Sequence, residues 1–349
     1  MAAKNTFNYN ALIKELNTNG ALGVYLLWGD EDYLREQFTA KLRSVCLPDG
    51  GNDFCYRRFD AEQLNMDELA DAVNAMPFMS ERSFIEIRGF DPAAVKDREM
   101  AALEAIISDI PDYCTIVFIT YPGKKPDMRL RLCKNIKKIG SVIEFAPQDE
   151  YKLTDWIIRR FAALGKSVSA STANRLILNS GDLMSGLIGE IEKIAAGTKA
   201  ELVTDSDVDR LGSKITSAKV FDMTNRISAG DFSAALAILN DLITSGDEPI
   251  MILAVIGMHM RDLYAARLTI DENLGRDYLI KICGKPWLAN PLLSSAKNFS
   301  LDSLSRCVQL CTEHDYLLKS SGGDSRDILL DLLINIYYYT VGGGDDENW

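Results

Sequence analysis

Four short apolar runs, separated by amphipathic stretches, occupy the first 147 residues of the chain. The runs read VYLLW, SFIEI, TIVFIT and SVIEF, at residues 24–28, 83–87, 115–120 and 141–145. β-Rich runs that alternate with helical patterns are typical of a domain in which helices connect the strands of a mostly parallel sheet. We therefore predict an α/β domain over residues 1–147, ended by Pro147.

The periodicity becomes helical after this point and stays helical to the end of the chain. An apolar stripe at helical spacing runs through residues 149–164, and Gly165 follows as a helix stop. Thr204 with Asp207 resembles a capping box that opens another helix. These patterns predict a small helical domain over residues 148–216.

Residues 217–341 show only amphipathic helical patterns, which predicts an all-α domain. The segment 342–349, GGGDDENW, is predicted to be a flexible tail because of its composition.

Composition and charge limit the classes of function that the chain can have. The chain has 349 residues, of which 47% are hydrophobic, and 38 basic against 50 acidic side chains give a net charge of −12. This length and hydrophobic content indicate two or three soluble, globular domains. Because an acidic protein repels polyanions on average, tight autonomous binding to DNA, RNA or an anionic membrane is disfavoured.

Cysteine and histidine usage excludes much of the common chemistry. The seven cysteines are an odd number without paired CxxC spacing, which favours reduced thiols in a cytoplasmic protein. His259 and His314 are the only histidines, so metal sites and most Ser-His-Asp arrangements lack their side chains. We see no signal peptide and no unbroken apolar run near the ~20 residues of a membrane span. The sequence thus predicts no metal and no cofactor.

The turn after the first apolar run is where a nucleotide-binding α/β domain has its phosphate loop. Here Gly29 is followed by three carboxylates, Asp30, Glu31 and Asp32. A phosphate loop needs GxxxxGK[ST], so that backbone N–H groups and a lysine surround the phosphates. Carboxylates would repel that ligand, and we interpret them as acidic residues at a helix N-terminus.

A second sequence, Gly165-Lys166-Ser167, matches only the last part of the phosphate-loop pattern. It follows a predicted helix and not a strand, so we interpret it as a helix stop. The run 115–120 also lacks the adjacent Asp-Glu pair that would bind Mg²⁺ and activate water. ATP hydrolysis therefore lacks both of its expected parts.

Residues 124–138 form a basic segment within this acidic chain. Its basic side chains outnumber the single acidic one, Asp127, and are Lys124, Lys125, Arg129, Arg131, Lys134, Lys137 and Lys138. They are candidates for contact with phosphate or an acidic partner. A solvated helix face is the simpler interpretation, because no aromatic residue follows Tyr121 in the segment.

The segment before the second apolar run, NAMPFMSER, places three large apolar side chains around Pro77. The proline interrupts a helix and could present Met76, Phe78 and Met79 as a compact apolar wedge. Composition alone favours the alternative, in which Phe78 and Met79 point into the core beneath the sheet, because such residues are more often buried than displayed.

Taken together, the motifs resemble a known family over nearly all of the chain. In order they are VYLLWGDEDYL, AMPFMSERSFIEIRGF, TIVFIT with the basic segment, WIIRRFAALGKSVS, SGDLMSGLIGEIEKI and HDYLLKSSGGDSRDILLDLLI. This set resembles the delta subunit of the bacterial DNA polymerase III clamp loader. The resemblance implies an AAA+-like α/β domain with a mostly parallel sheet, a small helical lid and an all-α C-terminal collar.

The resemblance also implies a function in DNA replication. Such a subunit binds the sliding clamp (beta) and holds it open for loading onto primed DNA, without hydrolysing ATP itself. Its collar joins the other loader subunits, gamma/tau and delta-prime. No intrinsic catalysis is expected, although the holoenzyme has DNA-directed DNA polymerase activity. By position, the implied clamp-binding residues are Met76, Pro77, Phe78, Met79 and Arg82, with Phe78-Met79 where the family often has Leu-Phe.

Two alternatives stay open. A delta-prime-type or motor subunit would carry a zinc-binding CxxC set or a phosphate loop, with Ser-Arg-Cys in its first domain. Here Ser305-Arg306-Cys307 lies in a late predicted helix, which we interpret as coincidence. The other alternative is a nucleotide-dependent AAA+ enzyme with a degenerate site.

Overall fold

Five parallel strands form a single sheet in the N-terminal part of the chain, in the order β2-β3-β4-β1-β5. The strands are β1 (Val24–Trp28), β2 (Tyr56–Asp60), β3 (Ser83–Arg88), β4 (Cys114–Ile119) and β5 (Ser141–Glu144). The predicted parallel sheet is thus confirmed. Every residue of β1 and β4 is buried, as expected for central strands covered on both faces. Strand β2 was not predicted.

The structure is a computed structural model that describes residues 8–48, 54–320 and 323–341. It divides into two units, Met1–Gln148 with Leu183–Ser185, and Asp149–Asp182 with Gly186–Trp349. Each unit has a hydrophobic core of its own. The predicted tail, residues 342–349, lies outside the described residues. The division of the second unit into lid and collar stays a prediction.

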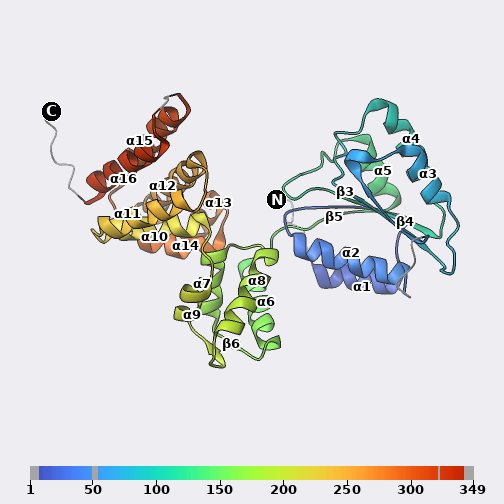
Figure 1. The fold of residues 1–349 in the computed structure, drawn as a ribbon, viewed down its shortest axis with the longest axis horizontal. Coiled ribbons are helices and arrows are strands. Elements are labelled where there is room, and N and C mark those ends of the chain that lie inside the picture. The colour runs from blue at the N-terminus through green and yellow to red at the C-terminus, as the bar shows by residue number, and fades with distance from the viewer. Residues whose placement is uncertain (1–7, 49–53, 321–322, 342–349) are drawn as a thin grey trace. The chain divides into compact units, whose positions relative to one another are not determined.

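Helices cover both faces of the sheet (Figure 1). Helices α1 (Tyr9–Asn19) and α2 (Asp32–Cys46) lie on one face. On the other face lie α3 (Met66–Asn74), α4 (Asp97–Ser108) and α5 (Arg131–Ile139). A short 3₁₀ helix, η1 (Ala61–Gln63), precedes α3 in the chain. The core on this second face joins apolar side chains of β1, β3 and β4 to those of the three helices.

One ion-pair network ties α2 to the sheet. Arg88 at the end of β3 donates to both carboxylate oxygens of Glu36, over 2.6 and 2.7 Å, and also pairs with the buried Glu86. The hydrogen bonds from Arg88 hold the pKa of Glu36 below its usual range. A bidentate pair of this kind fixes geometry as well as charge.

The second unit begins with helices α6 (Glu150–Ala163), α7 (Ala170–Ser180), α8 (Met184–Gly197) and α9 (Asp205–Leu211). Two-residue strands, β6 (Ser167–Val168) and β7 (Leu202–Val203), pair in parallel among them. The predicted capping box of Thr204 and Asp207 is present at the start of α9.

Seven helices follow, with no strand among the described residues beyond 216. They are α10 (Thr216–Ser228), α11 (Phe232–Thr244), α12 (Pro249–Asp271), α13 (Arg276–Cys283), α14 (Pro286–Ala296), α15 (Leu301–Ser320) and α16 (Ser325–Val341). Helix α12 is central, because its buried residues join one core with those of α10, α14, α15 and α16. Gly257 lies where α12 packs against α15, and a Cβ atom there would be in ordinary van der Waals contact with the Cβ of Cys311, at 3.4 Å.

Helix α12 is the long apolar helix of this unit. By length and composition it could cross a membrane, with a mean hydropathy of 1.2 over its most apolar 18 residues. It is not an unbroken apolar run, because Arg261, Asp262 and Arg267 interrupt it. Its apolar character is explained by packing, because nine of its residues, from Ile252 to Thr269, are buried inside the unit.

Candidate functional site

The segment between α3 and β3 exposes large apolar side chains. Met76, Phe78 and Met79 are 80%, 62% and 84% exposed. We call residues 76–79 the apolar turn. The alternative in which Phe78 and Met79 point into the core is therefore wrong. Helix α3 ends at Asn74, before the proline, and the side chains that follow are exposed. Exposure on this scale for three neighbouring apolar side chains is unusual in a soluble protein.

Hydrogen bonds hold the apolar turn at both ends. At its start, the Tyr113 hydroxyl donates to the carbonyl of Asn74 over 3.1 Å. Farther on, the buried thiol of Cys55 donates to the carbonyl of Phe78 over 3.2 Å. Met79 has a φ of 60°, a left-handed conformation that non-glycine residues rarely adopt. The exposed side chains are thus carried by a fixed backbone.

Arg82 has a different position from its neighbours in the predicted set. Its side chain is only partly exposed, and its guanidinium donates to the hydroxyl of Thr115 on β4 over 3.1 Å. Pro77 is also partly exposed. The structure therefore brings Met76, Phe78 and Met79 together on the surface, while Arg82 fastens the end of the turn to the sheet.

One aromatic neighbour of the apolar turn was missed by the sequence analysis. The ring of Phe54 meets that of Phe78 edge to face, with centroids 6.3 Å apart. It precedes β2, an edge strand whose polar sequence YRRFD gave no apolar signal. Because β2 is an edge strand with mostly exposed side chains, its sequence has no alternating or continuous apolar pattern from which a strand could be predicted.

The basic segment lies on and before α5, where it forms an exposed helix face. Leu132, Cys133 and Ile136 bury the opposite face. The basic residues at the N-terminal end are partly neutralised: Arg129 pairs with Asp127, and Arg131 pairs with Glu104 over 3.1 Å.

Other members of the basic segment differ in their contacts. Lys124 lies 3.8 Å from Asp91, and Lys125 lies over the ring of Trp28. Lys134, Lys137 and Lys138 are exposed and have no ion pair with any described residue. Their spacing of three and four residues places all three on the same side of α5.

The turn after β1 is occupied by the chain's own groups. Gly29 has a φ of 120°, and a Cβ atom there would lie 2.3 Å from the carbonyl oxygen of Phe145. The N–H group of Glu31 donates to that same oxygen over 2.9 Å. The buried guanidinium of Arg35 donates to the Gly29 carbonyl over 2.8 Å and pairs with Asp32. The acidic residues lie at the start of α2, as predicted.

Lys166 of the partial phosphate-loop match has a structural role. Its ammonium group donates to the carbonyls of Thr198 and Ala200, over 2.6 and 2.8 Å, just beyond the end of α8. A cation there complements the negative end of the helix dipole. Gly165 has a φ of 72°, which agrees with the predicted helix stop.

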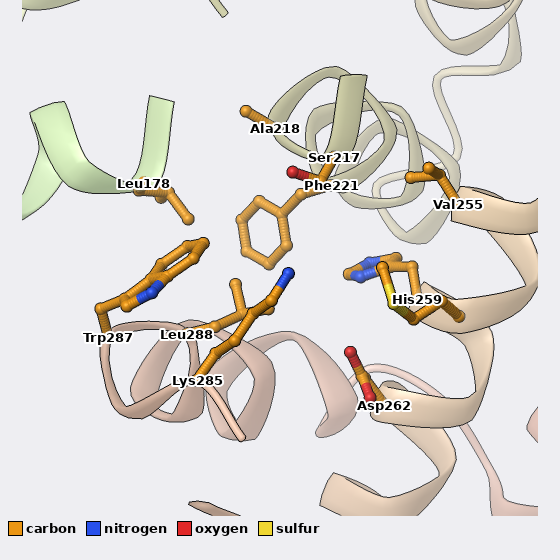
Figure 2. Close-up of a pocket in the computed structure, with 11 residues that line it drawn as sticks. Leu178, Ser217, Ala218, Phe221, Val255, His259, Asp262, Lys285, Trp287 and Leu288 are labelled. Carbon is orange, nitrogen blue, oxygen red and sulfur yellow. The ribbon is translucent and has the colours of Figure 1, made fainter. Parts of the chain in front are cut away.

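Figure 2 shows a pocket lined by α7, α10, α12 and α14, in which Phe221 and Trp287 face His259, Asp262 and Lys285. Its volume is about 20 Å³, enough for about one water molecule. Burial raises the pKa of Asp262, and the nearby charge of Lys285 opposes that effect. Within residues 8–48, 54–320 and 323–341, no group of three or more His, Cys, Asp or Glu side chains is arranged to hold a metal ion.

Comparisons with known proteins agree with this architecture. The chain is 24% identical over 332 residues to DNA polymerase III subunit delta of Bacillus subtilis, covering 92% of this chain and 94% of that protein. It is 21% identical over 254 residues to a probable DNA polymerase III subunit delta of Aquifex aeolicus, covering 70% of each.

A solved structure shows the same fold. The Bacillus subtilis DNA clamp loader delta protein superposes with a TM-score of 0.55 at 24% identity, covering 95% of this chain and 99% of that one. Residues 25–146 match the family described as DNA polymerase III, delta subunit, and residues 217–336 match the C-terminal domain of the same subunit. Because these two matches cover the α/β sheet and the C-terminal helices in order, the chain belongs to the family of DNA polymerase III delta subunits.

Proposed function

We propose that this chain is the clamp-loader subunit that binds the sliding clamp through the apolar turn and holds the clamp open for loading onto primed DNA. The observation that carries the proposal is the exposure of Met76, Phe78 and Met79 on a backbone held at both ends. Apolar side chains grouped on a surface mark contacts with other proteins.

The energetics of the apolar turn suit a protein contact. Burying three side chains of this size contributes about 1.5 to 3 kcal/mol each, or roughly 5 to 9 kcal/mol together, before the cost of association. Because hydrogen bonds already fix the backbone of the turn, little conformational freedom remains to be lost on binding. A small surface therefore suffices for specific binding.

Opening of the clamp requires no bond to be made or broken. A protein that binds the open form of a ring more tightly than the closed form shifts the population toward the open form. The proposed mechanism is of this kind, with the apolar turn as the part that discriminates between the two forms.

The turn at Gly29 supports the proposal that the chain does not hydrolyse ATP. Three carboxylates occupy this place, and the N–H group of Glu31 is bound to the carbonyl of Phe145. Triphosphate would meet negative charge where a phosphate loop offers free N–H groups and a lysine. A degenerate AAA+ enzyme would have to bind nucleotide despite this arrangement.

We expect the purified chain to speed the release of closed clamps from nicked circular DNA in the absence of ATP. The expected effect is about tenfold or more, since a difference of about 1.4 kcal/mol in affinity for the two forms changes an equilibrium tenfold. Clamp release followed by gel filtration measures this rate. Added ATP and Mg²⁺ should not change it, and isothermal titration should detect no binding of ATP.

Stoichiometric binding of ATP would instead favour the degenerate enzyme. A chain that neither retains the clamp nor speeds its release would contradict the proposed function altogether. A delta-prime-type subunit would bind neither clamp nor nucleotide but would still join the other loader subunits.

We also propose that the C-terminal helices join gamma/tau and delta-prime subunits, with the chain acting in the cytoplasm. Figure 1 shows α15 and α16 near the C-terminal end of the chain. Tyr316, Ile334 and Tyr338 on these helices are exposed apolar residues. Such side chains support a protein contact at this surface.

For the basic segment we propose contact with DNA phosphates in the assembled loader, through Lys134, Lys137 and Lys138. Changing all three to glutamine should weaken binding of the assembled loader and clamp to primed DNA. The slope of log affinity against log salt should fall by up to about 0.9 for each phosphate that the variant no longer neutralises. Lys281→Gln, on the exposed surface of α13, is the control. Equal salt slopes for the variant and wild type would show that the face is only solvated.

A further inference from the structure

Phe54 and Phe78 of the apolar turn form an exposed pair of aromatic rings, although Phe54 lies more than twenty residues earlier in the chain. The side chain of Phe54 is 66% exposed, and its ring lies at 72° to that of Phe78. Edge-to-face pairs are favourable beyond the area they bury. Both rings nevertheless leave most of their surface to solvent, so their mutual contact accounts for only part of what they offer.

The backbone fixes the position of Phe54 relative to the apolar turn. Its neighbour Cys55 is buried, and the carbonyl of Cys55 accepts from the N–H of Phe84 on β3 over 2.7 Å. The thiol of Cys55 donates to the carbonyl of Phe78. Cys55 is thus bound to the sheet through its carbonyl and to the turn through its thiol, so the chain next to Phe54 is tied to the backbone of Phe78.

We propose that Phe54 is a further contact residue for the sliding clamp, and that its ring is buried against the clamp together with Phe78. This inference rests on the proposed function. Aromatic side chains dominate the binding energy of protein interfaces when they lie near the centre of the contact. Met76 and Met79 on the same turn supply adaptable apolar surface around the two rings.

An indirect role of Phe54 has to be distinguished from direct contact with the clamp. Phe54 could act only inside the molecule, by holding the ring of Phe78 in place. In that case its removal would weaken clamp binding solely through Phe78, and it would have no effect once the Phe78 ring is absent. A double-mutant cycle distinguishes these cases.

The test measures clamp affinity of the full chain by surface plasmon resonance for Phe54→Ala, Phe78→Leu and the double variant. Phe78→Leu removes the ring but keeps an apolar side chain, so that binding stays measurable. We expect Phe54→Ala to lower affinity about tenfold in both backgrounds. Tyr151→Ala, at another exposed aromatic residue, on α6, is the control and should bind as wild type.

Each other outcome contradicts a defined part of the proposal. An effect of Phe54→Ala that disappears beside Phe78→Leu would show that Phe54 only supports Phe78. Normal binding by Phe54→Ala, with weak binding by Phe78→Leu, would remove Phe54 from the interface and leave the proposed function intact. Normal binding by all three variants would remove both rings from the interface and contradict this inference; only normal binding by Phe78→Ala, Met79→Ala as well would contradict the proposed function. Thermal melting should be close to wild type in every variant, because both side chains are largely exposed.

Discussion

The double variant Phe78→Ala, Met79→Ala should bind the sliding clamp at least about a hundredfold more weakly than the wild-type chain. Truncating two large apolar side chains that become buried on binding removes about 3 kcal/mol or more, and every 1.4 kcal/mol is a factor of ten. Both side chains are mostly exposed in the free protein, so the free energy of unfolding should change little. Surface plasmon resonance of the full chain against the purified clamp measures the decrease in affinity.

Thermal melting and a control variant make the result of this experiment unambiguous. If Phe78 and Met79 were core residues, the variant would be destabilised by several kcal/mol and its melting temperature would fall steeply. Met251→Ala on α12, another exposed methionine, controls for the general removal of apolar surface. Unchanged clamp binding together with normal melting would remove the apolar turn from the interface.

The stability of the second unit should decrease between pH 6.5 and pH 4 because of one histidine. His259 on α12 is buried, and burial lowers its pKa from the ordinary 6.5 to about 4. The unfolded chain therefore binds a proton in this range while the folded chain does not. The stabilisation is fully present above pH 6.5 and is lost as the pH falls toward 4. The difference corresponds to about 3 kcal/mol.

The surroundings of His259 explain why it stays neutral. The Thr224 hydroxyl donates to the carbonyl of Phe221, so its oxygen accepts from Nε2 of His259 over 2.8 Å. The ring also meets Phe221 edge to face. A second proton would place a charge among apolar side chains of the core, which costs free energy unless the charge is paired.

A variant that cannot titrate isolates this contribution. His259→Gln can still donate to Thr224 but has no pKa in the range. Urea unfolding of both proteins between pH 7 and pH 4.5 should show the wild type losing stability relative to the variant as the pH falls. The other titratable groups are the same in both proteins and cancel in the difference. Parallel pH profiles would contradict a buried, neutral His259.

The sequence predicted those elements whose residues are buried in a regular pattern. The four apolar runs became β1, β3, β4 and β5, and the region 217–341, predicted to be all-α, contains only helices among its described elements. Strand β2 was missed because an edge strand with exposed Arg57 and Arg58 has no apolar pattern.

The candidate site could be predicted only in part, for a physical reason. The residues around Pro77 could be singled out from the sequence as a group of large apolar side chains. Composition favours burial for Phe78 and Met79, and only the tertiary fold determines that they are exposed. Phe54 was out of reach altogether, because its contact with Phe78 depends on the pairing of β2 with β3. Local patterns carry no information about such long-range pairing.

The close approach of Gly29 to Phe145 limits how this protein could be re-engineered. Writing a lysine and a serine into the turn would not turn the chain into an ATP-gated switch. The N–H group of Glu31 is already bound to the Phe145 carbonyl, and any side chain at position 29 would collide with that oxygen. A designer would first have to move β5 away from β1, and so dismantle the edge of the sheet that positions the turn.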